Sequence, residues 1–180
     1  MFYCNMHNTF PNKFYFINTF KKNNIDKLNV NTGVIFRNYN KKVSIYEIIQ
    51  IKKYCKKRGL KFFLSNNFKL AIKLDLDGSY IPAFNQSLRH LSYKTKSSFI
   101  IIGSAHNVKE IRKKEAQRVK FIFISSIFKK NKNYLGLYRF RLLSKLTNKS
   151  VIALGGISKL NQKKIKLLDC SGISGISYFE

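Results

Sequence analysis

Short apolar segments recur along the chain and alternate with polar, lysine-rich segments. The apolar segments are rich in Ile, Val and Phe and are followed by polar, Gly or Pro positions, which is typical of strands buried on both faces of a parallel sheet. The pattern therefore predicts eight strands. They are Lys13–Ile17, Gly33–Phe36, Leu60–Leu64, Gly78–Ile81, Phe99–Ile102, Val119–Ile124, Val151–Leu154 and Gly172–Ser177.

Helices are predicted in the segments between these strands. Ser44 and Glu47 have the spacing of a capping box, in which the serine oxygen accepts from the amide three residues on and the glutamate reaches back. This predicts a helix from Ser44 to a stop at Gly59, and Asn107–Glu110 predicts a second capped helix. The first interval has room only for a short helix near Ile25–Leu28. The remaining predicted helices are Phe68–Leu74, Tyr138–Leu146 and Leu160–Leu168.

Eight strands with interleaved helices indicate an α/β protein with a (β/α)8 TIM barrel, formed by a single domain over residues 1–180. The chain is compact for this fold because the first helix is short and an eighth helix is missing, since the sequence stops at Glu180. An open doubly wound sheet is the alternative. It is disfavoured because no GxGxxG motif follows the first strand.

The missing eighth helix predicts an apolar flank beside the first and last strands. Two covers for this flank stay open. One is the N-terminal residues Phe2, Tyr3 and Phe10, and the other is a second subunit, which would make the protein a homodimer through this flank.

The composition restricts the class of protein. The sequence has no run of about 18 apolar residues that would cross a membrane, and its first residues lack the basic start and apolar core of a signal peptide. We therefore expect a cytoplasmic protein without a membrane partner. Cys4, Cys55 and Cys170 lie far apart and without CxxC spacing, so they predict neither a disulfide framework nor a zinc site.

The net charge of +27 is the largest departure from an ordinary composition. A positive field of this size attracts nucleic acids, acidic membranes and phosphorylated small molecules alike. Lysine pairs are spread along the chain rather than gathered in one stripe, and no aromatic-basic RNA motif is present. Either the field serves an anionic ligand or it follows from the lysine-rich composition. Of the anionic partners, we expect a phosphorylated small molecule rather than a nucleic acid.

The carboxyl ends of the last two predicted strands carry a phosphate-binding pattern. Gly155 and Gly156 follow the seventh strand, and Ile176 and Ser177 end the eighth. Two glycines let backbone N–H groups converge on one point without a Cβ in the way, and the loops after these two strands are where such barrels recurrently bind phosphate. A tight turn without a ligand is the alternative interpretation.

Side chains at other strand ends are candidate catalytic groups. Arg37 follows the second strand, and Ser104 and His106 belong to the end of the fifth. The histidine is suited to binding a phosphate or donating a proton, or else to a structural role. Lys130 and Lys132 lie in the loop after the sixth strand, which is either solvated or folds over a pyrophosphate. None of the eight carboxylates of the chain lies at these ends, so the residues predict no metal site.

Several segments, taken in order, resemble the thiamine-phosphate synthase/TenI family. They are Phe14–Ile17, Phe36–Arg37, Phe62–Asn67, Asp77–Pro82, Gly103–His106, Phe121–Phe128, Ala153–Ile157 and Gly172–Ser177. Members of this family are (β/α)8 barrels of thiamine biosynthesis. The synthase joins a pyrimidine pyrophosphate to a thiazole phosphate with magnesium, whereas TenI-type members bind or tautomerise the thiazole phosphate.

The resemblance implies roles for the candidate residues. Gly156, Ile176 and Ser177 would hold the thiazole phosphate through their backbone N–H groups. Arg37 and Ser104 would face the pyrimidine pyrophosphate.

The chain also departs from the synthase pattern. Where the family has its magnesium carboxylates, this sequence has Asn66, Asn67 and Asn85, whose amide oxygens are weaker ligands for a hard cation. The family's threonine and lysine loop after the sixth strand is replaced here by Lys130, Lys132 and Asn133. The sequence therefore predicts no cofactor firmly, and magnesium is the one that the resemblance leaves open.

Three hypotheses follow. The first is a TenI-like barrel that binds thiazole phosphate, with coupling or tautomerase activity altered or reduced. The second is a working synthase that uses lysines where its relatives use magnesium carboxylates. The third is a basic nucleic-acid-binding protein, which would bind duplex or RNA with a steep salt dependence.

Overall fold

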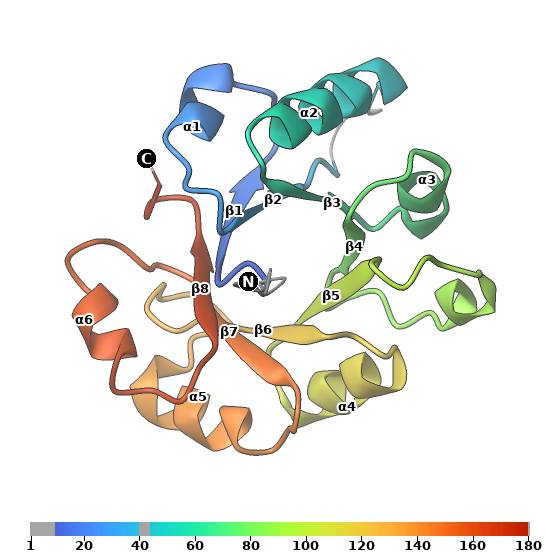
Figure 1. Ribbon diagram of the computed structural model, residues 1–180. Coiled ribbons are helices and arrows are strands. Elements are labelled where there is room, and N and C mark those ends of the chain that lie inside the picture. Colours follow the sequence, from blue (N-terminus) through green and yellow to red (C-terminus); the bar gives the residue numbers. More distant parts are fainter. Residues whose placement is uncertain (1–9, 40–43, 180) are drawn as a thin grey trace, which may run out of the picture.

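The computed structural model describes residues 10–39 and 44–179, which form a closed barrel of parallel strands (Figure 1). The strands are β1 (Lys13–Ile17), β2 (Thr32–Phe36), β3 (Lys61–Ser65), β4 (Gly78–Ile81), β5 (Ile100–Ala105), β6 (Phe121–Ser125), β7 (Ser150–Leu154) and β8 (Gly172–Gly175). They follow one another around the barrel in chain order, and β1 pairs with β8 to close it. This closure confirms the (β/α)8 barrel and excludes the open sheet.

Helices surround the barrel on its outer side. They are α1 (Lys22–Asp26), α2 (Ile45–Lys57), α3 (Phe68–Lys73), α4 (Val108–Ala116), α5 (Gly136–Ser144) and α6 (Gln162–Ile165), with a 3-10 turn, η1 (Arg89–Ser92), between β4 and β5. Within the described ranges, no helix has the length and apolarity that crossing a membrane requires. The first helix is short, as predicted.

The helix α6 covers less of the chain than the predicted Leu160–Leu168. Asn161 accepts a hydrogen bond from the amide of Ser158 (2.9 Å) and donates from its Nδ2 to the carbonyl of Gly156 (2.8 Å). These two bonds hold the chain in a turn up to the first residue of the helix. The segment therefore begins its helix late, and the helix has a single turn.

Of the two predicted helix caps, one is confirmed and one is wrong. The Oδ1 atom of Asn107 accepts from the amide of Glu110 (2.9 Å) at the start of α4. Ser44 precedes α2 but its side chain makes no capping bond. Glu47 instead accepts from the amide of Phe20 (3.2 Å), in the connection between β1 and α1. A tertiary partner therefore replaces the local one.

Large aromatic side chains fill the barrel interior. Phe14, Phe63 and Phe123 are fully buried, and the rings of Phe14 and Phe123 have centroids 4.9 Å apart. Glycines make room for them, since a Cβ on Gly33 would lie 2.7 Å from Phe14 Cδ1 and one on Gly78 would lie 2.8 Å from Phe63 Cε1. The barrel is a packed core rather than a pore, so a ligand site is restricted to its rims.

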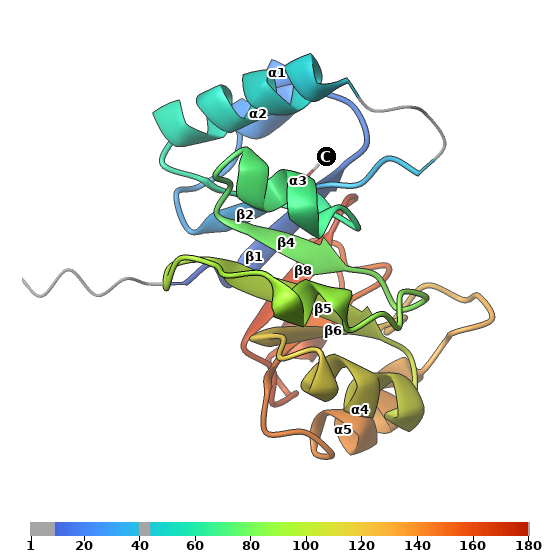
Figure 2. The ribbon, with the colours of Figure 1, turned by 90° about the vertical axis from the view of Figure 1, so that its right-hand side faces the viewer.

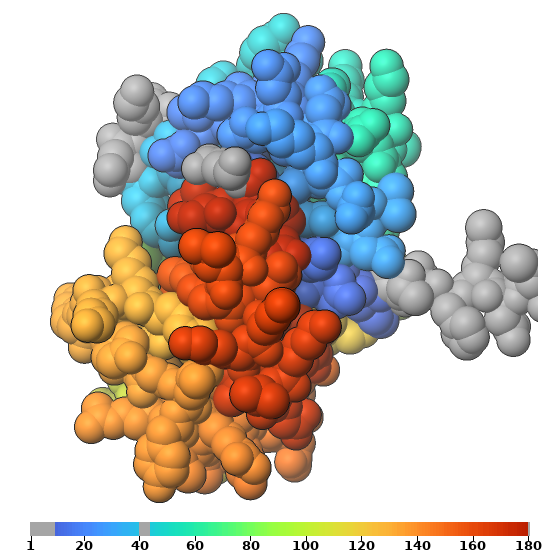
Figure 3. Space-filling view, turned by 90° about the vertical axis from the view of Figure 1, so that its left-hand side faces the viewer, coloured from blue at the N-terminus to red at the C-terminus, as the bar shows by residue number. Residues whose placement is uncertain are grey.

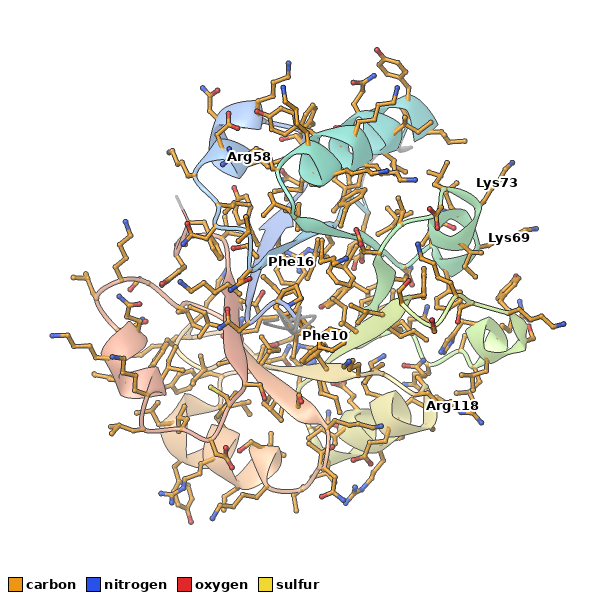
Figure 4. All side chains as sticks on the ribbon, in the orientation of Figure 1. Phe10, Phe16, Arg58, Lys69, Lys73 and Arg118 are labelled. Atoms are coloured by element: carbon orange, nitrogen blue, oxygen red, sulfur yellow. The ribbon has the colours of Figure 1, made fainter. Side chains whose placement is uncertain are left out.

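The flank beside β1 and β8 carries no helix after β8 among the described residues, and Figure 3 shows the last residues of the chain at the surface there. Tyr178 and Phe179 turn back over it, and the ring of Phe179 lies 5.1 Å from that of Tyr15. The predicted cover by Phe10 is wrong. The Phe10 ring packs on that of Phe121, with centroids 6.1 Å apart, and lies near the barrel axis in Figure 4. Phe2 and Tyr3 lie outside the described residues, and the homodimer stays a prediction.

Candidate functional site

The carboxyl ends of all eight strands form one rim, and in Figure 2 the connections after β4 and β6 extend beyond the strands at this rim. In the turn after β7, Gly155 and Gly156 have φ angles of 106° and 74°, in the left-handed region that favours glycine. A Cβ on Gly156 would lie 2.6 Å from the amide nitrogen of Lys129. The two glycines therefore allow both the turn itself and the close packing of a neighbouring loop against it.

That neighbouring loop follows β6 and is fixed at its base. The amides of Phe128 and Lys129 donate to the carbonyl of Gly155 at 2.8 and 3.2 Å, and the amide of Ile127 donates to Leu154 at 3.0 Å. Lys130 and Lys132, further along the loop, are exposed and form no ion pair with any described carboxylate. Their position beside the glycine turn is compatible with contact to an anion, and this role stays a prediction.

The turn after β7 lies beside the end of β8. The register pairs Leu154 with Ser174, so Gly156 and Ile176 each lie two residues beyond this pair. A Cβ on Gly175 would lie 3.8 Å from the carbonyl oxygen of Ile157, which shows that the two strand ends are in contact.

Several backbone N–H groups at this junction have no protein acceptor in the described part of the chain. Within the described ranges, the amides of Gly156, Ile176 and Ser177 donate to no carbonyl or side chain outside the strand ladder. The predicted phosphate-binding residues thus lie on one rim, and their N–H groups have no protein acceptor in the described ranges, which leaves them free to bind an anion. Binding itself stays a prediction.

Arg37 follows β2 and reaches the same rim. Its guanidinium carbon lies 4.6 Å from the ring centroid of Phe16, which stands inside the barrel (Figure 4). It lines a cavity of about 680 Å³ that opens between the ends of β1, β2 and β8. The lining residues are Tyr15, Phe16, Ile17, Asn18, Thr19, Lys21, Asn24, Arg37, Asn38, Tyr39 and Ile176.

Ser104 contacts Tyr80, one of two tyrosines at this rim that the sequence analysis did not select as candidates. Its side chain is buried and hydrogen-bonds the hydroxyl of Tyr80, and burial raises the pKa of that hydroxyl well above its ordinary value. The hydroxyl of Tyr39 lies 2.7 Å from Ser65 Oγ, and burial raises its pKa too. The alternation of β4 places Tyr80 inside the barrel, which is the signal that could have found it.

His106 is the candidate that the structure separates from the others. Its Nδ1 lies 2.9 Å from Glu110 Oε2, and the same oxygen accepts from the backbone amide of His106 at 2.7 Å. It does not line the cavity beside Arg37. Glu110 thus ties the histidine to the first turn of α4.

The three asparagines at the positions of the family's magnesium carboxylates already have partners. Asn67 Oδ1 caps α3 by accepting from the amide of Leu70 (3.2 Å). Asn66 Oδ1 accepts from Asn85 Nδ2 (2.7 Å), and Asn85 Oδ1 accepts from the amide of Ser87 (2.9 Å). Each amide oxygen is therefore engaged by a protein donor, and this donor set does not fit a magnesium site.

The connection after β4 is held by a buried lysine that the sequence reasoning also missed. Lys114 donates to the carbonyls of Pro82 and Asn85, both at 2.9 Å, and to Gln117 Oε1 at 2.8 Å. Burial lowers the pKa of its ammonium group to about 8. The spacing of Lys114 from the buried Ile111, on one face of α4, is the pattern that signals burial.

The fold and the rim define a (β/α)8 barrel whose candidate site joins backbone donors at β7 and β8 to a cation at β2. A family model described as thiamine monophosphate synthase matches residues 28–179, and the chain belongs to this family. It is 30% identical over 146 residues to a thiamine-phosphate synthase of Prochlorococcus marinus, with 79% of this chain and 42% of the relative covered. It is 27% identical over 120 residues to that of Methanococcus vannielii, covering 64% and 58%.

The fold comparison agrees with the family. A solved structure of thiamine phosphate pyrophosphorylase from Pyrococcus furiosus superposes with a TM-score of 0.75 at 18% identity, covering 94% of this chain and 87% of that one. The chain spans about half the length of the two curated relatives.

Proposed function

We propose that this barrel acts in thiamine biosynthesis by binding a thiazole phosphate at the ends of β7 and β8. The contact between the glycine turn and the end of β8, with the amides of Gly156, Ile176 and Ser177 available, carries the proposal. Several N–H groups that converge on one point bind a phosphate through charge-assisted hydrogen bonds without requiring a cation. Membership of the thiamine monophosphate synthase family supports a thiazole phosphate as that ligand.

We further propose that the coupling or tautomerase activity of the chain is altered or reduced. Departure of a pyrophosphate group requires strong compensation of negative charge. The oxygens of Asn66, Asn67 and Asn85 have protein donors and cannot supply the magnesium site that the family pattern implies. Arg37 and Ser104 remain as candidates to face a second substrate.

His106 is the third candidate for the reaction. Because Glu110 holds its Nδ1, the Nε2 atom is the nitrogen left to exchange a proton. Its distance from the cavity beside Arg37 argues for a role outside that cavity.

A working synthase is the second candidate function. The cavity of about 680 Å³ favours it, because it lies beside Arg37 and borders Ile176, so two ligands have room on one rim. Incubation of both substrates with the protein in EDTA distinguishes the two functions. Formation of thiamine phosphate there supports a metal-independent synthase, and no product supports the altered or reduced activity.

Calorimetry with two ligands tests the thiazole phosphate site itself. We expect the phosphorylated thiazole to bind about 10- to 100-fold more tightly than the corresponding alcohol, because hydrogen bonds to a charged group contribute about 1.5–3 kcal/mol. Equal affinities of the two ligands would contradict the proposal. An excess of duplex DNA in the cell shows whether a nucleic acid competes.

A further inference from the structure

The segment that contains α5 and α6 carries positive charge without negative charge. Between Glu115 and Asp169 the sequence has no aspartate or glutamate. Glu115 itself is engaged by Arg112 Nη1 (2.8 Å) and Thr147 Oγ1 (2.6 Å). Exposed cations lie on or beside the two helices and form no ion pair with any described carboxylate. They are Arg139, Arg141, Lys145, Lys159, Lys163, Lys164 and Lys166.

Large apolar side chains project from the same two helices. Among the described residues, the most exposed large apolar side chains are Leu160 (95%), Leu167 (79%) and Tyr138 (76%). Leu160 and Leu167 flank α6. Tyr138 lies on α5, and the exposed Leu142 and Leu146 follow it at intervals of four residues. Apolar side chains gathered on a surface among charged groups are typical of an interaction site.

The two helices present these groups together. Phe140 of α5 and Ile165 of α6 are buried in one hydrophobic cluster, so the helices are neighbours on the outer side of the barrel. Figure 1 shows them next to each other, and Figure 3 shows their residues on one face, in orange and red-orange. The cations and apolar side chains named above form what we call the α5–α6 face.

We propose that the α5–α6 face binds the surface of an anionic lipid bilayer. Lysines and arginines are attracted by acidic headgroups, and apolar side chains that project beyond the protein surface insert at the boundary of the acyl chains. A bilayer requires no complementary pocket, which suits leucines that protrude singly, as Leu160 and Leu167 do. The expectation of no membrane partner rested on the lack of a spanning segment or leader, and contact with a membrane surface requires neither.

Other occupants match this face less well. A second copy of the chain carries the same net charge of +27, so repulsion opposes its approach. Nucleic acids bind aromatic side chains by stacking, whereas leucines offer no such contact. The inference does not depend on the proposed function, because the thiazole phosphate site lies at the rim and this face on the outer side of the barrel.

Sedimentation with lipid vesicles tests the contribution of charge. The vesicles consist of phosphatidylcholine, either alone or with about one-third phosphatidylglycerol. We expect binding to the anionic vesicles only, and we expect the double substitution Lys163→Gln and Lys164→Gln to weaken it about 10- to 30-fold, since each lysine at an acidic surface contributes about fivefold.

Lys56→Gln with Lys57→Gln is the matched control. It removes the same charge from the last turn of α2, which lies across the barrel from α5 in Figure 1, and we expect a change below about twofold. Equal losses in the two double variants, or no binding of the wild type to anionic vesicles, would overturn the inference.

A tryptophan reporter tests the insertion of the apolar side chains. The sequence has no tryptophan, so Leu160→Trp and Val30→Trp each introduce a single one, and Val30 is 66% exposed in the connection between α1 and β2. With anionic vesicles we expect the emission of Leu160→Trp to shift to shorter wavelength and that of Val30→Trp to stay unchanged, because only the first ring leaves water. No shift in Leu160→Trp, or the same shift in both, would contradict insertion.

Leu160→Ser combined with Leu167→Ser separates the membrane from other occupants. We expect this variant to bind anionic vesicles at least about 10-fold more weakly and thiazole phosphate as the wild type does, since both leucines are exposed. Unchanged vesicle binding together with conversion of a dimer to a monomer would identify the face as an interface between copies instead. Binding of duplex DNA but not of vesicles, weakened by Lys163→Gln with Lys164→Gln, would assign the face to nucleic acid. Either result would refute the membrane contact.

Discussion

Two cations near the same rim, Lys114 and Arg37, are withdrawn from bulk water in opposite ways. Lys114 is fully buried, and each of its three N–H donors has a protein acceptor at 2.8 to 2.9 Å. Arg37 is half-buried, rests on an aromatic ring and has no carboxylate partner among the described residues. The first charge is satisfied inside the fold, whereas the second is available to a ligand.

This difference divides the rim into two sides. On the side of β4, the Lys114 ammonium and the pair formed by Asn66 and Asn85 close the connection and use up its polar groups. On the side of β1, β2 and β8, donors and cations face a cavity. The comparison teaches that polar groups with protein partners hold the scaffold together, whereas polar groups without protein partners are available to bind a ligand.

The largest effect is expected from Lys114→Met. The substitution leaves the carbonyls of Pro82 and Asn85 and the Gln117 oxygen without this donor, so we expect the free energy of unfolding to fall by about 2–4 kcal/mol. Urea denaturation followed by circular dichroism measures it. A loss below about 0.5 kcal/mol would contradict the structural role of this lysine.

The dependence of stability on pH tests the burial of Lys114 further. The pKa of Lys114 is about 8 in the folded state and 10.5 in the unfolded state, so between these values the unfolded chain binds more protons and stability rises with pH. We expect the stability difference between wild type and Lys114→Met to widen by about 2 kcal/mol from about pH 7 to about pH 9.5. Denaturation of both proteins at the two pH values measures it, and a constant difference would exclude the lowered pKa.

On the side of β1, β2 and β8, we expect stability to depend on the backbone conformation of the glycine turn rather than on a buried charge. Gly156→Ala places a Cβ at positive φ and 2.6 Å from the amide nitrogen of Lys129, so we expect a loss of about 1–3 kcal/mol. Gly175→Ala is the control, because its Cβ would meet nothing closer than 3.8 Å. Thermal unfolding of both variants compares them. Equal losses would show that the glycine turn is not strained by a side chain.

The smallest effect on stability is expected from Arg37→Met. The unbranched methionine retains packing on Phe16, so unfolding changes by less than about 1 kcal/mol while pyrophosphate affinity falls about 10- to 100-fold. Denaturation and calorimetry on one preparation give both numbers. A stability loss as large as that of Lys114→Met would erase the distinction between the two cations.

The sequence was sufficient for the barrel and for the glycine turn, because both depend on local patterns. Apolar runs set the strands, and glycines after β7 allow a turn that other residues adopt only under strain. The rest depends on contacts between distant segments. Glu47 binds the amide of Phe20 instead of capping α2, and Lys114 finds acceptors in a connection about 30 residues away in the sequence.

The candidate site, too, was predictable only where its residues follow strands. Gly156, Ile176 and Arg37 were found because they follow strands, and the structure brings them to one rim. Lys21 was not found, because the cavity it lines is assembled from the ends of three strands and no single segment of the sequence shows a motif for it. His106 was also selected because it follows a strand, but the sequence does not show that Glu110, in the first turn of α4, binds its ring nitrogen.

Binding of thiazole phosphate to Ser177→Asp and Ser171→Asp is the measurement that bears on the phosphate site without disturbing the glycine turn. Both serines are exposed, and they flank β8 at opposite rims, so the two carboxylates differ only in their distance from the proposed site. We predict that Ser177→Asp weakens binding at least about 10-fold by repulsion and that Ser171→Asp stays within about twofold of the wild type. Equal affinities of the two variants would contradict a phosphate site at the ends of β7 and β8.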